Sequence, residues 1–406
     1  MENGVIATMR TLLAATFLLA PAMWAQSLTG LWDATITVNE VPIPFRMEFS
    51  GSGSTVAGSF FNGDEKWTST AGRFEKGALR LSFNFYGSRL EAAWKDGALD
   101  GAYIRDGRTY AFHAVPASPV SVRAGEVPLI AGQWEMATQS SKGEAAWHLI
   151  VRQSGAEVSA AILRVDGDTG TLTGLWKDGK FVLSHFSGAR PSLLEITPQK
   201  DGSLEVVQNG RNKMTAWRSA EARAKGLAEP DDPAKHTSVK DPSERFHFRF
   251  PDLAGNIVSD TDARFQNKVV IVAIGGTWCP NCHDEAPFLV ELYRRYHASG
   301  LEIVALDFED AEQLKDRARV QAFIQRYGIE YPVLIAGETD ELNAKVPQAV
   351  NLDAWPTTFF LGRDGRVRTV HAGFAGAASG EFHKQLRAEV TALVESLLAE
   401  NKVSER

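Results

Sequence analysis

The chain has 406 residues, and its 50 acidic side chains outnumber its 43 lysines and arginines, giving a formal net charge of −7 at pH 7. No basic patch stands out, so nucleic acids and anionic membrane surfaces are poor candidates as partners. Two cysteines are too few for a disulfide-stapled scaffold. The length suffices for about two or three domains.

Residues 1–25 have the pattern of an export signal. An apolar core at residues 12–19 is followed by small residues that suit cleavage, up to Ala25. Residues 1–8 carry no basic side chain, whereas a start at Met9 gives a more ordinary signal peptide. We therefore expect a start at Met9 and a periplasmic or otherwise extracytoplasmic protein. An uncleaved membrane anchor stays open as an alternative, although the apolar run is short for a span.

Residues 28–115 alternate apolar and polar side chains in short runs that end at glycine turns, which is typical of β-strands. We expect about eight strands there, enough for a small up-and-down barrel. The pattern recurs over residues 130–218, where Gly30-Leu-Trp32 returns as Gly132-Gln-Trp134. The Gly-x-Trp opening is similar to that of lipocalin- and avidin-type barrels. The sequence thus predicts a tandem repeat of two small lipocalin/avidin-like barrels.

The first repeat is rich in aromatic side chains, among them Phe60, Trp67 and Tyr103. Such residues normally fill the core of a small barrel, and this is the interpretation that we favour. An apolar ligand inside the barrel, or a partner docked on it, is the alternative.

Residues 219–245 contain no Phe, Tyr or Trp and mix charges of both signs with prolines. Such a segment buries too little apolar surface to order itself. We therefore predict an interdomain linker, with a short helix near residues 220–227.

Residues 246–400 alternate strand-like and helix-like patterns, which indicates an α/β domain. Apolar, β-branched runs predict the strands, and apolar stripes at a spacing of three and four residues predict the helices. The expected elements are strands at 269–274, 301–306 and 331–335, a helix at 314–327, a hairpin of 357–361 with 366–370, and a closing helix at 381–398.

The only cysteines lie two residues apart in Trp278-Cys279-Pro280-Asn281-Cys282, between the first of these strands and a helical pattern. A helix N-terminus stabilises a thiolate, so Cys279 is the expected nucleophile and Cys282 the resolving thiol. A metal site would need two further ligands, and a disulfide across so short a loop constrains little chain. We therefore expect a redox-active Cys279–Cys282 disulfide, no metal and no other cofactor.

Several motifs make the last domain similar to the thioredoxin superfamily, specifically to the TlpA/ResA-like extracytoplasmic thiol–disulfide oxidoreductases. The resemblance covers about residues 246–400 and none of the β repeats. Its motifs are Phe250-Pro-Asp-Leu, the Cys279–Cys282 stretch, Glu285-Ala-Pro287, Trp355-Pro-Thr-Thr-Phe-Phe-Leu361 and Asp364-Gly365.

The resemblance implies substrate-binding positions opposite the thiols. Pro356 matches the family's cis-proline, and the backbone beside it would pair with an extended substrate segment. With Trp278, Trp355 and Thr357, it forms the expected substrate site. Trp355 either shapes the groove or packs against Trp278.

The resemblance also implies a partly buried carboxylate at Glu285, which would accept and return a proton during exchange. The alternative is an ordinary surface glutamate. Ordinary thioredoxins carry an aspartate six residues before the first cysteine, where this chain has Ala273, so Glu285 would take over proton handling. His283 is expected on the helix surface.

Together these features predict an exported thiol–disulfide oxidoreductase that acts on client proteins, more as a reductase than as an oxidase. Its electron donor would be a membrane or periplasmic protein. The alternative is a binding protein in which the β repeats dock a partner or an apolar ligand and the redox domain is secondary.

Overall fold

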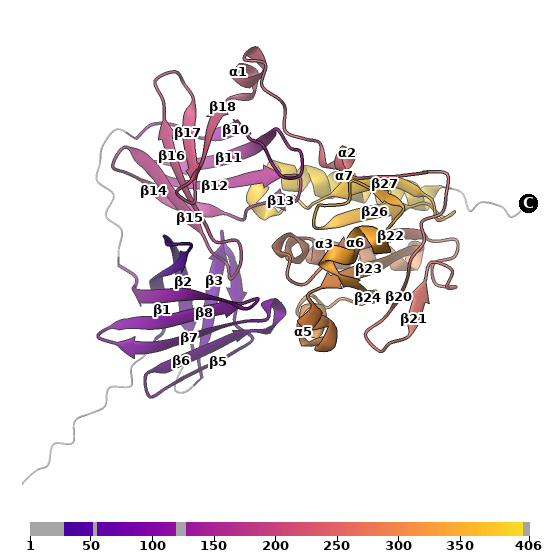
Figure 1. The fold of residues 1–406 in the computed structure, drawn as a ribbon, viewed down its shortest axis with the longest axis horizontal. Helices are drawn as coiled ribbons and strands as arrows, with labels where there is room; N and C mark the ends of the chain where they lie inside the picture. The colour runs from indigo at the N-terminus through magenta and orange to yellow at the C-terminus, as the bar shows by residue number, and fades with distance from the viewer. Residues whose placement is uncertain (1–27, 52–54, 119–126, 401–406) are drawn as a thin grey trace, which may run out of the picture.

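The computed structural model of the protein describes residues 28–51, 55–118 and 127–400. The predicted export signal lies outside these residues. Two all-β units lie one above the other on one side of the molecule, and an α/β domain lies on the other (Figure 1). Within the described part of the chain, no helix is long and apolar enough to cross a membrane.

The first β unit is a curled sheet of nine strands in the order β4-β3-β2-β1-β9-β8-β7-β6-β5. Its end strands β4 and β5 form no ladder in the described structure, so the closed barrel that the sequence predicted is wrong for this unit. An isolated bridge between Thr55 and Arg73 of β5 is the pairing that the described residues make across this gap, in place of a continuous ladder. The strands are Gly30–Val38, Val41–Ser50, Ala57–Asn62, Glu65–Thr68, Ala71–Glu75, Ala78–Phe83, Ser88–Lys95, Ala98–Arg105 and Arg108–Pro116 (β1–β9), with the short helix η1 at Asn84–Tyr86.

The second β unit closes into a barrel of eight strands because β11 pairs with both β10 and β12. Its core is apolar, and Trp134 donates to Ile130 O just as Trp32 donates to Leu28 O in the first unit. The tandem duplication and the lipocalin likeness stay predictions. The strands are Gly132–Ala137, Ala146–Ser154, Glu157–Arg164, Gly167–Asp168, Leu172–Lys177, Lys180–His185, Ser192–Pro198, Leu204–Gln208 and Asn212–Trp217 (β10–β18).

Leu183 lies fully buried in this barrel, so its replacement should be costly. We expect Leu183→Ala to lower the free energy of unfolding by about 2–5 kcal/mol, through lost burial and the cavity that remains. Leu129→Ala is the matched control, because Leu129 is 80% exposed. Urea unfolding followed by circular dichroism would measure both, and equal effects of the two variants would contradict the barrel core.

The segment between the barrel and the α/β domain contains α1 (Ser219–Ala224), α2 (Pro233–His236) and β19 (Ser238–Val239). It packs along the α/β domain, since β19 pairs with β25 (Ala349–Val350) and His236 bonds to Asp353.

The α/β domain is built on a five-stranded sheet in the order β24-β23-β22-β26-β27. The first three strands are parallel to one another. β26 runs antiparallel to β22, and β27 runs antiparallel to β26. This is a thioredoxin-like sheet. The strands are Val269–Gly275 (β22), Leu301–Glu309 (β23), Val333–Glu338 (β24), Thr357–Leu361 (β26) and Val367–Ala372 (β27), with a separate small hairpin of Arg249–Pro251 (β20) and Ile257–Ser259 (β21).

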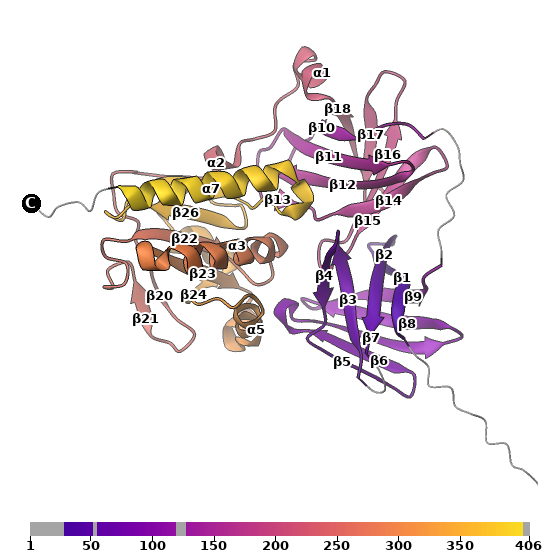
Figure 2. The same ribbon diagram turned by 180° about the vertical axis from the view of Figure 1, so that it is seen from behind.

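Helices cover both faces of this sheet because its central strands are apolar on both sides. Ile271 and its alternate neighbours in β22 face the core under α3 and α7, whereas Val272 faces the core on the other side, with Leu342 of α6. Figure 2 shows α3 and α7 lying across one face. The helices are Pro280–Tyr296 (α3), Ala311–Lys315 (α4), Ala318–Tyr327 (α5), Leu342–Lys345 (α6) and Glu381–Ala399 (α7), with single 3-10 turns at His297–Ser299, Thr339–Glu341 and Ala377–Ser379 (η2–η4).

The predicted strands, the hairpin and the closing helix of this domain are confirmed. The single helix expected at residues 314–327 is instead two helices, α4 and α5. The break lies at Asp316, whose backbone is extended and whose carboxylate accepts from Ala318 N at the start of α5. A short polar side chain of this kind favours a helix start over a helix interior.

Candidate active site

The two thiols lie where β22 gives way to α3. Cys279 is the N-cap residue of α3, Pro280 occupies the first helical position, and Cys282 N donates to Cys279 Sγ over 3.3 Å. Both are free thiols, and Cys279 is only 3% exposed. The unpaired N–H groups and the dipole of α3 favour negative charge at Cys279.

Cys282, the predicted resolving thiol, is also buried. Burial raises the pKa of the Cys282 thiol well above its usual range, and the neighbouring Cys279 raises it further. Cys282 therefore stays protonated near neutral pH unless a base lies close to it.

Glu285 is the carboxylate close to Cys282. Its side chain is buried, and Thr358 Oγ1 donates to its Oε1 over 2.7 Å. Burial raises the pKa of Glu285 to about 7, although the Thr358 bond opposes the rise. Glu285 and Cys282 line one cavity of about 40 Å³, which has room for a water molecule. The arrangement can take a proton from Cys282 and return it near neutral pH.

Ala273 fits the same arrangement, because it pairs across the sheet with Thr358. The strand position that bears an aspartate in ordinary thioredoxins thus carries no carboxylate here. The hydroxyl opposite it instead fixes Glu285, which approaches from α3.

The loop before β26 lies against Trp278, the residue that precedes Cys279. The Trp355–Pro356 bond is cis, and Thr357 Oγ1 donates to Ala354 O within the loop. The rings of Trp355 and Trp278 meet edge to face with their centroids 5.2 Å apart. Trp355 therefore packs against Trp278, one of the two alternatives that the sequence left open.

A buried ionic group beneath the loop was missed from the sequence. Thr277 N and Oγ1 both donate to Glu309, and the Arg319 guanidinium bonds to Glu309 and to Thr277 Oγ1. Because Glu309 is fully buried, its charge needs these partners. The group fixes the residue that precedes Trp278. An acidic residue at the end of a buried strand was its only signal in the sequence.

His283 is not on the helix surface, and that prediction is wrong. Its side chain is 1% exposed because Trp67, Phe85 and Tyr86 of the first β unit pack around it. Its ring nitrogens bond to Thr277 O and to Tyr327 Oη. Burial holds the pKa of His283 well below its usual range, so the ring is neutral.

Both β units contact the cysteine turn directly. Arg105 of the first unit donates to Trp278 O over 2.6 Å, and Asn281 Nδ2 donates to Asp166 O of the second unit over 2.7 Å. Arg319 also pairs with Asp106 of the first unit. The turn that carries the thiols is therefore covered by residues far away in the sequence.

No group of three or more histidine, cysteine or acidic side chains that could hold a metal ion occurs in residues 28–51, 55–118 and 127–400. The predicted roles of Trp278, Trp355, Pro356 and Thr357 in substrate binding stay predictions, as do those of the thiols and Glu285 in catalysis.

Comparison with known proteins agrees with this geometry. The AhpC/TSA family model matches residues 239–370 and none of the β region. The thiol-disulfide oxidoreductase ResA of Bacillus cereus (strain ATCC 10987 / NRS 248) is 31% identical over 136 residues, which are 33% of this chain and 70% of that protein. ResA of Bacillus thuringiensis (strain Al Hakam) is 31% identical over 121 residues, 30% of this chain, and the match spans 63% of that protein's length.

A solved structure, a thioredoxin family thiol:disulfide interchange protein from Chlorobium tepidum TLS, is 25% identical, with a TM-score of 0.31. It covers 40% of this chain, and all of that protein is matched. Through the domain that holds Cys279 and Cys282, the chain belongs to the family of ResA-like thiol–disulfide oxidoreductases.

Proposed function

We propose that the protein is an extracytoplasmic thiol–disulfide oxidoreductase that reduces disulfides in client proteins. The observation that carries the proposal is the pairing of two environments at one turn. Cys279 caps the N-terminus of α3, and Cys282 shares a small cavity with Glu285. The first environment favours an attacking thiolate, and the second provides a base for the resolving thiol.

In the first step, the Cys279 thiolate attacks one sulfur of a client disulfide. A bond forms between Cys279 Sγ and that sulfur, and the other client sulfur leaves as a thiolate. The client is then held as a mixed disulfide.

In the second step, Cys282 loses its proton to Glu285 and attacks Cys279 Sγ. The Cys279–Cys282 disulfide forms, and the second client sulfur leaves as a thiolate that is then protonated. The client has gained two electrons and the protein has lost two, so a dithiol donor must reduce the pair again. We assign that role to a membrane or periplasmic electron donor.

The proposed location rests on the apolar core at residues 12–19 and on the use of cysteine for chemistry alone. Fusing the first 30 residues to a reporter enzyme that is active only after export would test it. Reporter activity is the expected result, and a reporter held inside the cell would contradict the location.

The reduction potential of the thiol pair tests the activity itself. We would equilibrate the protein in glutathione or dithiothreitol buffers and count free thiols by mass after alkylation. A reversible two-electron transition near −270 mV, the value of thioredoxin, is expected for a reductase. A value near −120 mV would indicate an oxidase instead. The absence of any reversible transition would contradict redox catalysis.

A second candidate function is binding by the β units, with the redox domain secondary. Direct contacts of both units with the cysteine turn favour a role for them at the site. Phe60, Trp67 and Tyr103 fill the core of the first unit, which argues against an apolar ligand inside it. We therefore propose that the β units control access of clients to the thiols.

A further inference from the structure

One loop of the second β unit is bonded to the face of the redox domain next to the thiols. Asp166, between β12 and β13, accepts from Trp355 N through Oδ1 over 3.1 Å. Its backbone oxygen accepts from Asn281 Nδ2 over 2.7 Å and from Phe374 N over 3.1 Å. Asp166 therefore accepts hydrogen bonds from three donors of the redox domain, two of which belong to residues next to Cys282 and Pro356.

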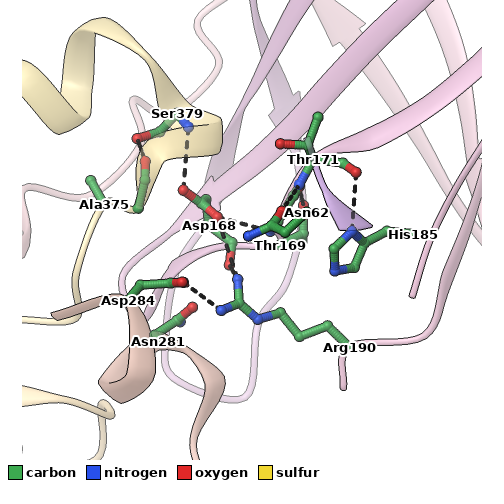
Figure 3. A network of polar contacts seen from close by, with 12 residues as sticks. Asn62, Asp168, Thr169, Thr171, His185, Arg190, Asn281, Asp284, Ala375 and Ser379 are labelled. Atoms are coloured by element: carbon green, nitrogen blue, oxygen red, sulfur yellow. Dashed lines mark hydrogen bonds and ion pairs between the residues drawn. The ribbon is translucent and has the colours of Figure 1, made fainter. Parts of the chain in front are cut away.

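Asp168 continues the contact two residues later. Its Oδ2 accepts from Ser379 N over 3.2 Å, just before α7 begins. Arg190 from the same barrel bonds to Asp168 and to Asp284 of α3, so a cation bridges the two units (Figure 3). These side chains are almost fully buried, so removing one charged partner would leave another charge buried without a counter-ion.

The loop approaches like an added strand. Gly167 forms a parallel bridge with Phe374. Side chains at the contact would clash: a Cβ on Gly167 would lie 2.0 Å from Phe374 O, and one on Gly373 would lie 2.0 Å from Val165 O. Backbone packed this closely against backbone resembles the way in which a peptide adds to a sheet edge.

The position of the loop matters because the backbone beside Pro356 is where an extended client would bind, if the proposed function holds. Its N–H is already bonded to Asp166, and Cys279 is 3% exposed. A client that binds beside Pro356 must therefore displace the loop, and its disulfide reaches Cys279 only after the residues around the cysteine turn move.

We propose that the loop of residues 164–168 is a built-in occupant of the client-binding face, and that clients carry an acidic extended segment that displaces it. The face offers N–H donors for two carboxylates spaced two residues apart, as Asp166 and Asp168 are. Asp284 lies on the same face and pairs with Arg190 while the loop is bound. A client that displaces the loop should therefore carry a basic residue that can pair with Asp284. The proposal rests on the proposed redox function.

Loosening the loop should expose Cys279. Asp166→Ala removes the acceptor of Trp355 N and the ion pair with Lys142 of the same barrel, and it leaves the bonds to the backbone oxygen of residue 166 in place. Because the bond to Trp355 N is the side-chain contact of Asp166 that crosses to the redox domain, its loss should make alkylation of Cys279 by iodoacetamide about fivefold faster in the reduced full-length protein. Asp166→Asn keeps an oxygen acceptor, so its alkylation rate should lie between those of the wild type and Asp166→Ala. Glu205→Ala, at an exposed acid of the same barrel, is the charge-matched control and should react like the wild type.

The pH profile of alkylation separates access from thiol chemistry. A change in loop opening multiplies the rate by the same factor at every pH, whereas a change in the thiol pKa moves the midpoint. The proposal would be overturned if Asp166→Ala were alkylated at the wild-type rate. It would also be overturned if the substitution shifted the midpoint of the pH profile without multiplying the rate by the same factor at every pH. The redox titration of the same variant should stay reversible. Loss of that transition in the wild type as well would count against the redox function instead.

Hydrogen exchange in the wild-type protein tests displacement without any substitution. The amides of Trp355 and Ser379 should exchange faster than that of Val272, which lies in the central strand, because the loop opens without unfolding the sheet. Equal exchange at all three amides, limited by global unfolding, would show that the loop is a fixed part of the fold.

Two synthetic disulfide peptides test the partner chemistry. One carries Asp-Gly-Asp followed by an arginine beside its disulfide, and the other carries Asn-Gly-Asn in the same place. Charge-assisted bonds are about twice as strong as neutral ones, so we expect the acidic peptide to be reduced with a kcat/KM about tenfold higher. Equal values, or a preference for the amide peptide, would contradict the acidic client.

Discussion

Cys279→Ser is expected to abolish disulfide reduction, lowering kcat/KM for insulin disulfides by on the order of a thousandfold or more. In the proposed reaction the Cys279 thiolate at the start of α3 is the attacking group, whereas a serine hydroxyl stays protonated at neutral pH and cannot form a disulfide. Dithiothreitol-dependent insulin reduction would measure the loss. A variant that keeps a tenth of the activity would contradict the role of Cys279.

Cys282→Ser should leave the attack by Cys279 intact and block the resolution of the mixed disulfide. Clients should then accumulate as mixed disulfides with Cys279, visible as larger species on non-reducing gels. The double variant Cys279→Ser with Cys282→Ser is the control and should trap nothing. If Cys279→Ser traps clients and Cys282→Ser does not, the two thiols have exchanged roles.

Local patterns were enough to place the two thiols in the fold. The β-branched run before Cys279 and the apolar spacing after Cys282 place the thiols at a strand-to-helix turn, and the structure has that turn. Glu285 lies one helical turn beyond Cys282, so sequence spacing alone sets its distance from that thiol. Such predictions succeed because the residues concerned share a single helix.

His283 and Asp166 show where sequence reasoning stops. His283 was expected on the helix surface, yet Trp67 and Tyr86, about 200 residues earlier, pack against it and bury it. Asp166 lies in a barrel turn that carries no redox motif, and only the packing of the units brings it to Trp355. Contacts between units depend on how whole surfaces fit, which periodicity within a segment does not encode.

Closure of the β units was likewise beyond the sequence. Both units alternate with period two, but among the described residues only the second unit has a ladder, between β11 and β12, that completes the ring. Closure depends on strand length and stagger around the whole sheet rather than on any single strand. The prediction of a closed barrel of about eight strands therefore fits the second unit and fails for the first.

Glu285→Gln should slow the second half of the reaction by about a hundredfold at pH 8, the size of effect typical of a lost general base. The wild-type carboxyl, with its pKa raised to about 7, is protonated below that pH and cannot take a proton from Cys282. The wild-type rate of mixed-disulfide resolution should therefore rise as the pH passes 7, and this rise should vanish in the variant. Stopped-flow measurement of resolution would show both effects. A rate that rises through pH 7 in both proteins would assign the titration to another group.

The same substitution should change stability in the opposite sense. Folding raises the pKa of Glu285 from 4.5 to about 7, so the folded protein binds its proton more tightly than the unfolded chain does. That contribution is fully present below pH 4.5 and is lost as the pH rises through 7. Between pH 5 and 8, the unfolding free energy of the wild type should therefore fall by roughly 2–3 kcal/mol more than that of Glu285→Gln, since one pKa unit corresponds to about 1.36 kcal/mol. Glu312→Gln, at an exposed position of α4, is the matched control and should follow the wild type. Because the variant gains stability at the pH where it loses rate, a parallel loss of both would mean that Glu285 supports the fold and handles no proton.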